Sequence, residues 1–147
     1  EGTRPRLPWG LQLKSFIADP SVNLNLLTKL KSDPSLYVRR SVANHLNDIA
    51  KDNPHVVIEI CKQWQKKELN KHELWVIQHA TRSLVKMGNK DVFPLLGYTD
   101  KPKVQIKELE FSSNKINRGD DLHFDFNLSS TSEKKSKNSC RLCYSLC

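Results

Sequence analysis

Five polar residues in the segment 33–51 could together bind a phosphate backbone. They recur at i, i+4, i+7, i+8 and i+11, so a helix places them on one face: Arg40, Asn44, Asn47, Asp48 and Lys51. Cations and amides are the groups that bind a phosphate backbone in nucleic-acid-binding proteins. Asp48 is the single acid among them. Asparagine has a low helix propensity, so two of them on a plain helix surface are unfavourable, which favours a function.

Asp48 is open to two interpretations from the sequence alone. It is either a functional acid or a surface carboxylate that pairs with Lys51 or Arg40. A functional role requires its carboxyl group to be exposed and to face the basic residues. If that side chain is buried, or points away from the basic residues, the interpretation of Asp48 as a functional acid fails.

The helix that positions these residues is predicted to begin with Asp33 as its N-cap and Pro34 at its first helical position. Another side of this helix carries an apolar stripe for a core: Val38, Val42, Leu46 and Ile49. The rest of residues 1–100 also has helical periodicity. Further helices are expected over 11–18, 21–31, 54–65, 72–87 and 92–97.

An internal repeat supports this all-helical organisation. Residues 37–46 match residues 75–84 position by position, with an aromatic residue on an aromatic residue and a leucine on a leucine. Two-helix units of this length are typical of HEAT- or armadillo-type stacking in an α-solenoid. The match extends to the polar face: Arg40 to Gln78, Asn44 to Arg82 and Asp48 to Lys86. Successive repeats are therefore expected to present polar groups on the same side.

From residue 101 the pattern changes from helical to alternating. Val104 and Ile106 alternate with polar residues, as do the apolar residues of 122–128, and a turn over 117–121 separates the two runs. Two strands cannot bury a sandwich core, so we expect a truncated β-sandwich over 101–147 beside a helical domain over 1–100.

The last stretch of the chain loses the strand pattern. Near residue 129 the sequence becomes rich in serine and lysine and then ends in NSCRLCYSLC. One permitted codon set for residues 138–147, read one base later, spells a good β-strand. We therefore hypothesise that a frameshift truncated the sandwich and left an aberrant tail.

The net charge of +8 favours an acidic partner such as nucleic acid, with a merely basic soluble protein as the alternative. No apolar run approaches the length of a membrane span, and no charged-then-apolar leader precedes a cleavage site. We therefore expect no contact with a membrane. The pattern of cysteines fits a reduced, cytoplasmic setting best, and the chain is expected to be a monomer.

Three of the four cysteines, Cys140, Cys143 and Cys147, lie close together at the end of the chain. The CxxC spacing of the first two suits zinc or redox chemistry, but zinc would need two further ligands and a redox pair needs a strand-to-helix context. We expect no metal and no cofactor. Cys61 lies on an apolar helix face and is expected in the core.

Three motifs resemble the DNA alkylation repair enzymes with HEAT-like repeats, and most closely their AlkC branch. The motifs are RPRLPW (Arg4 to Trp9), DPSLYVRRSVANHLNDIAKDNP (Asp33 to Pro54) and ELWVIQHATRSLVKMG (Glu73 to Gly88). The AlkC type adds an immunoglobulin-like β-domain after its helices, which agrees with the change of pattern near residue 100. The resemblance covers residues 1 to about 130 and corresponds to the C-terminal part of such a protein.

This resemblance implies a DNA glycosylase that removes cationic alkylated bases from duplex DNA, such as 3-methyladenine, 3-methylcytosine and 1-methyladenine. Asp48 matches the catalytic acid of the family, while Trp9, Arg4 and Arg6 match the motif beside the active site. The family's AlkC branch also uses an acidic residue well upstream of RPRLPW. That residue has no counterpart here, so the chain is expected to be a fragment that lacks part of the site.

The chemistry of these residues is consistent with that role. An N-alkylated base carries positive charge and leaves readily, so the enzyme needs an anion near C1′ to stabilise an oxocarbenium-like centre and to orient water. Asp48 could supply the anion, and Trp9 could attract the cationic base by about 0.5–2 kcal/mol. The residues expected to bind DNA are Arg4, Arg6, Arg39, Arg40, Asn44, Asn47, Lys51, His79, Arg82 and Lys86.

Other interpretations remain open. Trp9 could be a hydrophobic staple for the first helix, Trp75 is expected in the core, and His79 with Arg82 could be a solvated surface. The whole chain could instead be a HEAT-type scaffold for a protein partner, or a DNA-binding module that no longer cleaves.

Overall fold

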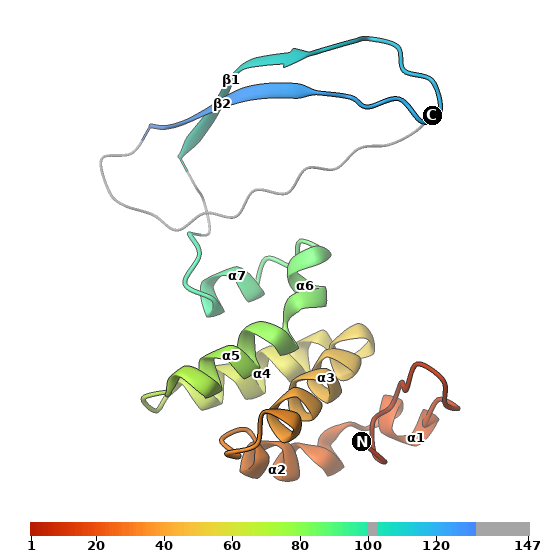
Figure 1. Cartoon of the computed structure of the whole chain (residues 1–147). Helices are drawn as coiled ribbons and strands as arrows, with labels where there is room; N and C mark the ends of the chain where they lie inside the picture. Colours follow the sequence, from red (N-terminus) through yellow and green to blue (C-terminus); the bar gives the residue numbers. More distant parts are fainter. Residues whose placement is uncertain (100–102, 132–147) are drawn as a thin grey trace. The chain divides into compact units, whose positions relative to one another are not determined.

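The computed structural model describes residues 1–99 and 103–131, and the chain divides into two units (Figure 1). We call residues Glu1–Gly97 the helical unit and residues Tyr98–Cys147 the β unit. All helices of the described residues lie in the helical unit, and the two strands lie in the β unit. The predicted fold class, mainly α, is confirmed.

The helical unit is built from short and medium helices joined by brief loops (Figure 1). Their bounds are α1 Lys14–Ala18, α2 Ser21–Leu30, α3 Leu36–Asp52, α4 Pro54–Gln65, α5 Lys71–Ala80, α6 Arg82–Lys86 and α7 Val92–Leu95. The longest of these, α3, contacts α2, α4, α5 and α6, so it lies at the centre of the unit. The helix with the most neighbours therefore carries the five polar residues expected to share one face: Arg40, Asn44, Asn47, Asp48 and Lys51.

The start of α3 differs from the prediction. The helix begins at Leu36 with Ser35 as its N-cap, and Asp33 lies ahead of it. The Asp33 carboxylate accepts a hydrogen bond from the backbone N–H of Ser35 at 2.8 Å, which closes a turn before the helix. The predicted role of Asp33 as N-cap is therefore wrong, because its side chain stabilises the preceding turn.

The predicted helix over 72–87 is broken in two, with Thr81 between α5 and α6. The hydroxyl of Thr81 donates to the carbonyl oxygen of Ile77 at 2.9 Å, and the backbone N–H of Ser83 donates to Oδ1 of Asn47 at 3.2 Å. A side chain from α3 thus satisfies a backbone donor at the start of α6. Helical periodicity along 72–87 could not reveal this break, since the partner lies thirty-six positions away.

The core of the helical unit contains the predicted apolar stripe of α3. Val42, Leu46 and Ile49 are buried, as are Cys61 and Trp64 of α4, so these core predictions are confirmed, whereas Val38 is only half-buried at the start of α3. Burial raises the pKa of the Cys61 thiol to about 12, which makes it an inert core side chain.

Leu46→Ala should lower the free energy of unfolding by about 3 kcal/mol, because the fully buried side chain leaves a cavity at the centre of the unit. Urea unfolding followed by circular dichroism measures this loss. Leu74→Ala on α5 is the matched control: Leu74 is 43% exposed, so the loss should stay below about 1 kcal/mol. Equal losses for the two variants would contradict this account of the core.

In the β unit, β1 (Val104–Phe111) pairs antiparallel with β2 (Phe124–Ser130). The rings of Phe111 and Phe124 lie opposite each other with centroids 6.4 Å apart. The register shifts near Glu108, which has a left-handed φ of 53° at this bulge. The alternation that predicted strands here is confirmed. The cysteine cluster of Cys140, Cys143 and Cys147 and the hypothetical frameshift lie outside the described residues.

Candidate functional site

The carboxylate of Asp48 is bound by two cations. Its Oδ2 accepts hydrogen bonds from Nε and Nη2 of Arg4 at 2.8 and 2.6 Å, and its Oδ1 accepts one from Nζ of Lys51 at 3.0 Å. Arg4 comes from the loop ahead of α1, forty-four positions away in the sequence. We call Glu1, Arg4, Asp48 and Lys51 the Asp48 cluster.

The expectation that Asp48 is exposed is wrong. Only 3% of the residue is accessible, because Arg4 covers the carboxylate from the N-terminal loop. Nη1 of Arg4 also donates to the Glu1 carboxylate at 2.9 Å. Burial alone would lower the pKa of Arg4, but its hydrogen bonds to Asp48 and Glu1 outweigh burial and raise it. Arg4 is therefore a fixed cation of the Asp48 cluster.

A second ion pair joins the same loop to α3. Nε and Nη2 of Arg6 donate to the two carboxylate oxygens of Asp52, each at 2.7 Å. The hydrogen bond from Arg6 lowers the pKa of Asp52, and the same bond raises the pKa of Arg6. Asp52 is one helical turn beyond Asp48, so the loop binds α3 through two successive Arg–Asp pairs.

Asn44 connects α3 with the region of α5 and α6. Its Oδ1 lies 3.2 Å from Nε2 of His79 and accepts a hydrogen bond from Nη2 of Arg82 at 3.1 Å. His79 stacks on Trp75, with ring centroids 4.9 Å apart and planes 10° from parallel. We call Asn44, Trp75, His79 and Arg82 the Asn44 cluster. Sequence reasoning predicted Asn44 and Arg82 at equivalent repeat positions but not their direct contact.

The charges of this region act on His79. Burial lowers the pKa of its imidazole, and the neighbouring Arg82 and Arg40 lower it further. The pKa of Arg82 is itself lowered, mainly by burial. The Asn44 cluster is therefore a site where cations already lie close together, which favours an incoming anion.

Two residues predicted to contact DNA point inward. Arg39 is buried, and its Nη1 donates to the carbonyl oxygens of Asp33 at 2.7 Å and Pro34 at 2.8 Å. Asn47 is buried against Ser83, where it accepts the backbone N–H described above. The predicted surface position of both residues is wrong, because their polar groups satisfy backbone partners at the ends of other segments.

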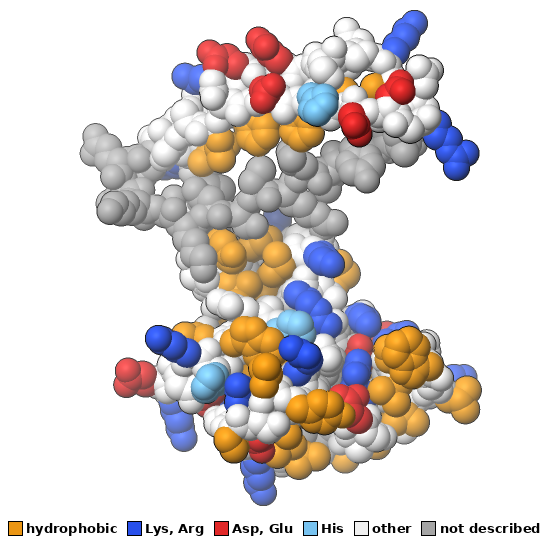
Figure 2. All heavy atoms as spheres, in the orientation of Figure 1, with side chains coloured by type: hydrophobic (Ala, Val, Ile, Leu, Met, Phe, Trp, Pro, Cys, Tyr) orange, Lys and Arg blue, Asp and Glu red, His pale blue; other side chains and the backbone are white. Residues whose placement is uncertain are grey.

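Several of the other predicted residues lie on the surface. Arg40, Lys51 and Lys86 are exposed, and Figure 2 shows basic and histidine side chains gathered over the region of α3, α5 and α6. Trp9 is 95% exposed. Such exposure excludes the hydrophobic staple considered for Trp9, since a staple must pack on its helix. Trp75, expected in the core, is half-buried and packs against the core while it stacks on His79.

His45 is a residue of this site that sequence reasoning did not single out for function. It is buried on α3, and its Nε2 has no hydrogen-bond partner among the described residues. Burial and the terminal ammonium group lower the pKa of His45 to about 4, although Asp48 acts in the opposite direction. Its position three residues before Asp48 is the only sequence signal that could have indicated it.

Within residues 1–99 and 103–131, no group of three or more His, Cys, Asp or Glu side chains is arranged to hold a metal ion. The same residues contain no helix with the length and apolar character needed to cross a membrane. The polar groups of the Asp48 and Asn44 clusters are carboxylates, an amide, an imidazole and basic side chains.

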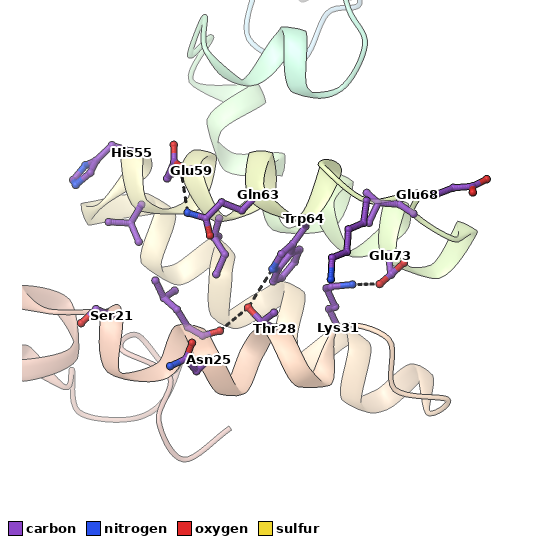
Figure 3. Close-up of a pocket in the computed structure, with 15 residues that line it drawn as sticks. Ser21, Asn25, Thr28, Lys31, His55, Glu59, Gln63, Trp64, Glu68 and Glu73 are labelled. Atoms are coloured by element: carbon purple, nitrogen blue, oxygen red, sulfur yellow. Dashed lines mark hydrogen bonds and ion pairs between the residues drawn. The ribbon is translucent and has the colours of Figure 1, made fainter.

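A hollow of about 760 Å³ lies between α2, α4 and the start of α5 (Figure 3). Inside it Nε1 of Trp64 donates to Oγ1 of Thr28 at 3.1 Å, and Lys31 pairs with Glu73. None of its lining residues belongs to the Asp48 or Asn44 cluster. The hollow is therefore a separate feature of the helical unit.

Two known proteins are similar to this chain over most of its length. The uncharacterized protein YhaZ of Bacillus subtilis (strain 168) is 42% identical over 135 residues, which is 92% of this chain and 37% of YhaZ. The solved structure of Pseudomonas fluorescens alkylpurine DNA glycosylase AlkC, bound to DNA containing an abasic site analog, is 45% identical. It matches with a TM-score of 0.84 and covers 90% of this chain and 36% of the AlkC chain.

No family model matches the chain. The chain spans little more than a third of the length of the two relatives. The resemblance to the AlkC type that the three motifs predict is confirmed by the match in sequence and in structure.

Proposed function

We propose that this chain, as the counterpart of a part of the alkylpurine DNA glycosylase AlkC, belongs to a protein that repairs alkylated DNA by hydrolysing the N-glycosidic bond of a cationic base. The substrates we propose are 3-methyladenine, 3-methylcytosine and 1-methyladenine in duplex DNA. We further propose that the helical unit is a HEAT-like solenoid, that the β unit is part of an immunoglobulin-like domain, and that the protein acts as a cytoplasmic monomer.

The observation that carries this proposal is the 45% identity with AlkC at a TM-score of 0.84 over 90% of the chain. At this identity the similarity extends beyond a shared fold to individual residues. The basic groups around Asp48 and Asn44 support the same proposal, because a glycosylase must hold a polyanion beside its acid.

The burial of Asp48 overturns the exposed acid expected from the sequence, so Asp48 is the proposed source of the anion near C1′ only in a state in which Arg4 has moved away from it. Both of its carboxylate oxygens are engaged, so catalysis requires the guanidinium of Arg4 to leave Oδ2 and the sugar to take its place. The exchange replaces one planar cation by another, since the reacting sugar becomes oxocarbenium-like. Lys51 can stay on Oδ1 and keep the carboxylate in position while the bond breaks.

The face of α3, α5 and α6 is the proposed surface for the DNA backbone. Arg40 and Lys86 are exposed there, and Arg82 belongs to the Asn44 cluster. Trp9, which is almost fully exposed, is the proposed aromatic contact for the damaged nucleotide. Arg6 is paired with Asp52, so we propose that it positions the N-terminal loop and reaches DNA only if that pair opens.

The burial of Asp48 favours a second candidate, a DNA-binding module that does not cleave. Asp48 is bound by Arg4 and Lys51 and is only 3% accessible, which leaves no room for a sugar while Arg4 covers its carboxylate. In that case Asp48 fixes the N-terminal loop on α3 and has no chemistry of its own.

Release of free base from alkylated duplex DNA separates the two candidates. The assay uses this chain and a chimera in which it is joined to the remaining part of the AlkC chain, and detects 3-methyladenine by chromatography. The glycosylase proposal predicts base release by the chimera and an abasic site in the product. A chimera that binds the duplex and releases nothing would support the module and overturn the glycosylase.

Binding of undamaged duplex DNA should weaken steeply as salt rises, because basic side chains release counterions from the phosphates. Arg40→Gln should make the negative slope of the logarithm of the DNA-binding constant against the logarithm of the salt concentration shallower by about one, since one phosphate contact is lost. The control is Lys62→Gln on α4, which removes an exposed charge outside this face and should leave the slope unchanged. Equal slopes for the native chain and both variants would show that Arg40 does not contact a phosphate. DNA binding that does not change with salt would favour a protein scaffold.

A further inference from the structure

The amide of Asn44 has a defined orientation. Its Oδ1 lies 3.1 Å from Nη2 of Arg82 and 3.2 Å from Nε2 of His79. A guanidinium has donors and no acceptor, so the Asn44 atom that faces Arg82 must be the carbonyl oxygen. The amide nitrogen of Asn44 is therefore directed away from both partners.

The same contact determines which nitrogen of His79 carries the hydrogen. Because the Asn44 oxygen only accepts, Nε2 must be the donor. Two further contacts hold this arrangement: the stack of His79 on Trp75 with planes 10° apart, and a hydrogen bond of 2.6 Å from Nη1 of Arg82 to the carbonyl oxygen of His79. The amide of Asn44 is thus positioned by side chains from two other helices.

The amide nitrogen of Asn44 has no acceptor among the described residues, and Asn44 is only half-buried. Its surroundings are cationic, since Arg82 touches it and Arg40 lies one turn earlier on α3. A donor next to two guanidinium groups suits an anion, and in DNA the anionic group is the phosphodiester. Asn44 is also one helical turn before Asp48, so a ligand of its amide would lie close to the Asp48 carboxylate.

We propose that the amide nitrogen of Asn44, oriented by His79 and Arg82, donates a hydrogen bond to a DNA phosphodiester beside the nucleotide whose sugar faces Asp48. This inference rests on the proposed function and specifies one contact of the same site. Asn44 acts as a positioning residue, because it holds the backbone and does not touch the bond that breaks. His79 acts through Asn44, since its own N–H is already used to orient the amide.

Two variants of Asn44 test the contact. Asn44→Ala removes the donor without a change of charge, and Asn44→Asp keeps an oxygen for Arg82 and His79 but removes the amide nitrogen. Both should weaken binding of an undamaged duplex at fixed salt, Asn44→Ala by about tenfold and Asn44→Asp by more than that, because the added charge repels phosphate. The control Asn25→Asp introduces the same charge at an exposed position of α2 and should change affinity less than about twofold.

A spectroscopic readout accompanies the binding data. Asn44→Asp places a carboxylate against His79, so the pKa of the imidazole should rise in an NMR titration if the cluster has kept its geometry. A rise together with weakened binding shows that the cluster is still folded while position 44 no longer binds a phosphate, as the proposal requires, and Asn44→Ala separates the lost donor from the added charge. An unchanged imidazole pKa would mean that the acceptor on Asn44 does not face His79, which overturns the proposal.

A methylphosphonate scan identifies the group that Asn44 contacts. The scan uses duplexes that contain an abasic site and one neutral methylphosphonate, which is moved one position at a time around that site. At one position the methylphosphonate should weaken DNA binding by the native chain and leave DNA binding by Asn44→Ala unchanged. If no position behaves in this way, or if Asn44→Ala binds as tightly as the native chain, the phosphodiester contact is disproved while the glycosylase proposal stands. If the native chain and the AlkC chimera bind no duplex at all, the proposed function fails as well.

Discussion

Asp48→Asn should lower release of 3-methyladenine at least about 100-fold in whichever form of the protein cleaves, because the amide cannot stabilise a cationic sugar. The substitution should also destabilise the helical unit by about 2 kcal/mol, since Arg4 and Lys51 lose their shared carboxylate. Single-turnover base release, scaled to the folded fraction from circular dichroism, separates the chemical effect from the loss of stability.

Asp52→Asn provides a control on the same helix. Asp52 binds an arginine of the same N-terminal loop through two hydrogen bonds, one turn further along α3. Its loss should loosen the loop to a similar degree but reduce base release less than about threefold, because the Asp52 carboxylate binds Arg6 and has no part in the proposed chemistry. If the two variants lose equal activity, the effect comes from the loop and the catalytic role of Asp48 is wrong.

Acid should destabilise the helical unit through His45. Its pKa is lowered to about 4 in the folded chain from an ordinary value of 6.5, so the unfolded chain binds the proton more tightly. Stability is therefore complete above pH 6.5, falls as the pH drops, and has lost about 3 kcal/mol once the pH is below the folded pKa. Urea unfolding at pH 7.5, 5.5 and about 4 measures the decline.

His45→Leu should remove most of this decline, because a leucine fills the buried site without a group that protonates. The carboxylates of Glu1 and Asp52, whose pKa values are lowered, add a loss of the same sign at lower pH, which the variant should retain. His72→Leu replaces an exposed histidine of α5 and should keep the full decline. A native-like decline in His45→Leu would show that another group is responsible.

The sequence by itself determined most of the helices, the two strands and the chemical character of the site, but not the break between α5 and α6. Apolar residues at helical spacing predicted α3 and its buried stripe through Val42 and Leu46, and alternation predicted the two strands. These features depend on neighbours in sequence, since the period of a helix or strand decides which residues share a face. The three motifs also predicted the resemblance to AlkC.

Only the tertiary structure decided what covers each face. Asp48, Asn47 and Arg39 were expected on the surface, but they are buried and bind Arg4, the backbone N–H of Ser83 and the carbonyl oxygen of Asp33. Arg4 and Ser83 lie more than thirty positions from the groups they bind. Periodicity reports the angle of a side chain around its own helix and contains no information about a distant segment that packs there. The orientation of the Asn44 amide is of the same kind, because His79 and Arg82 come from other helices.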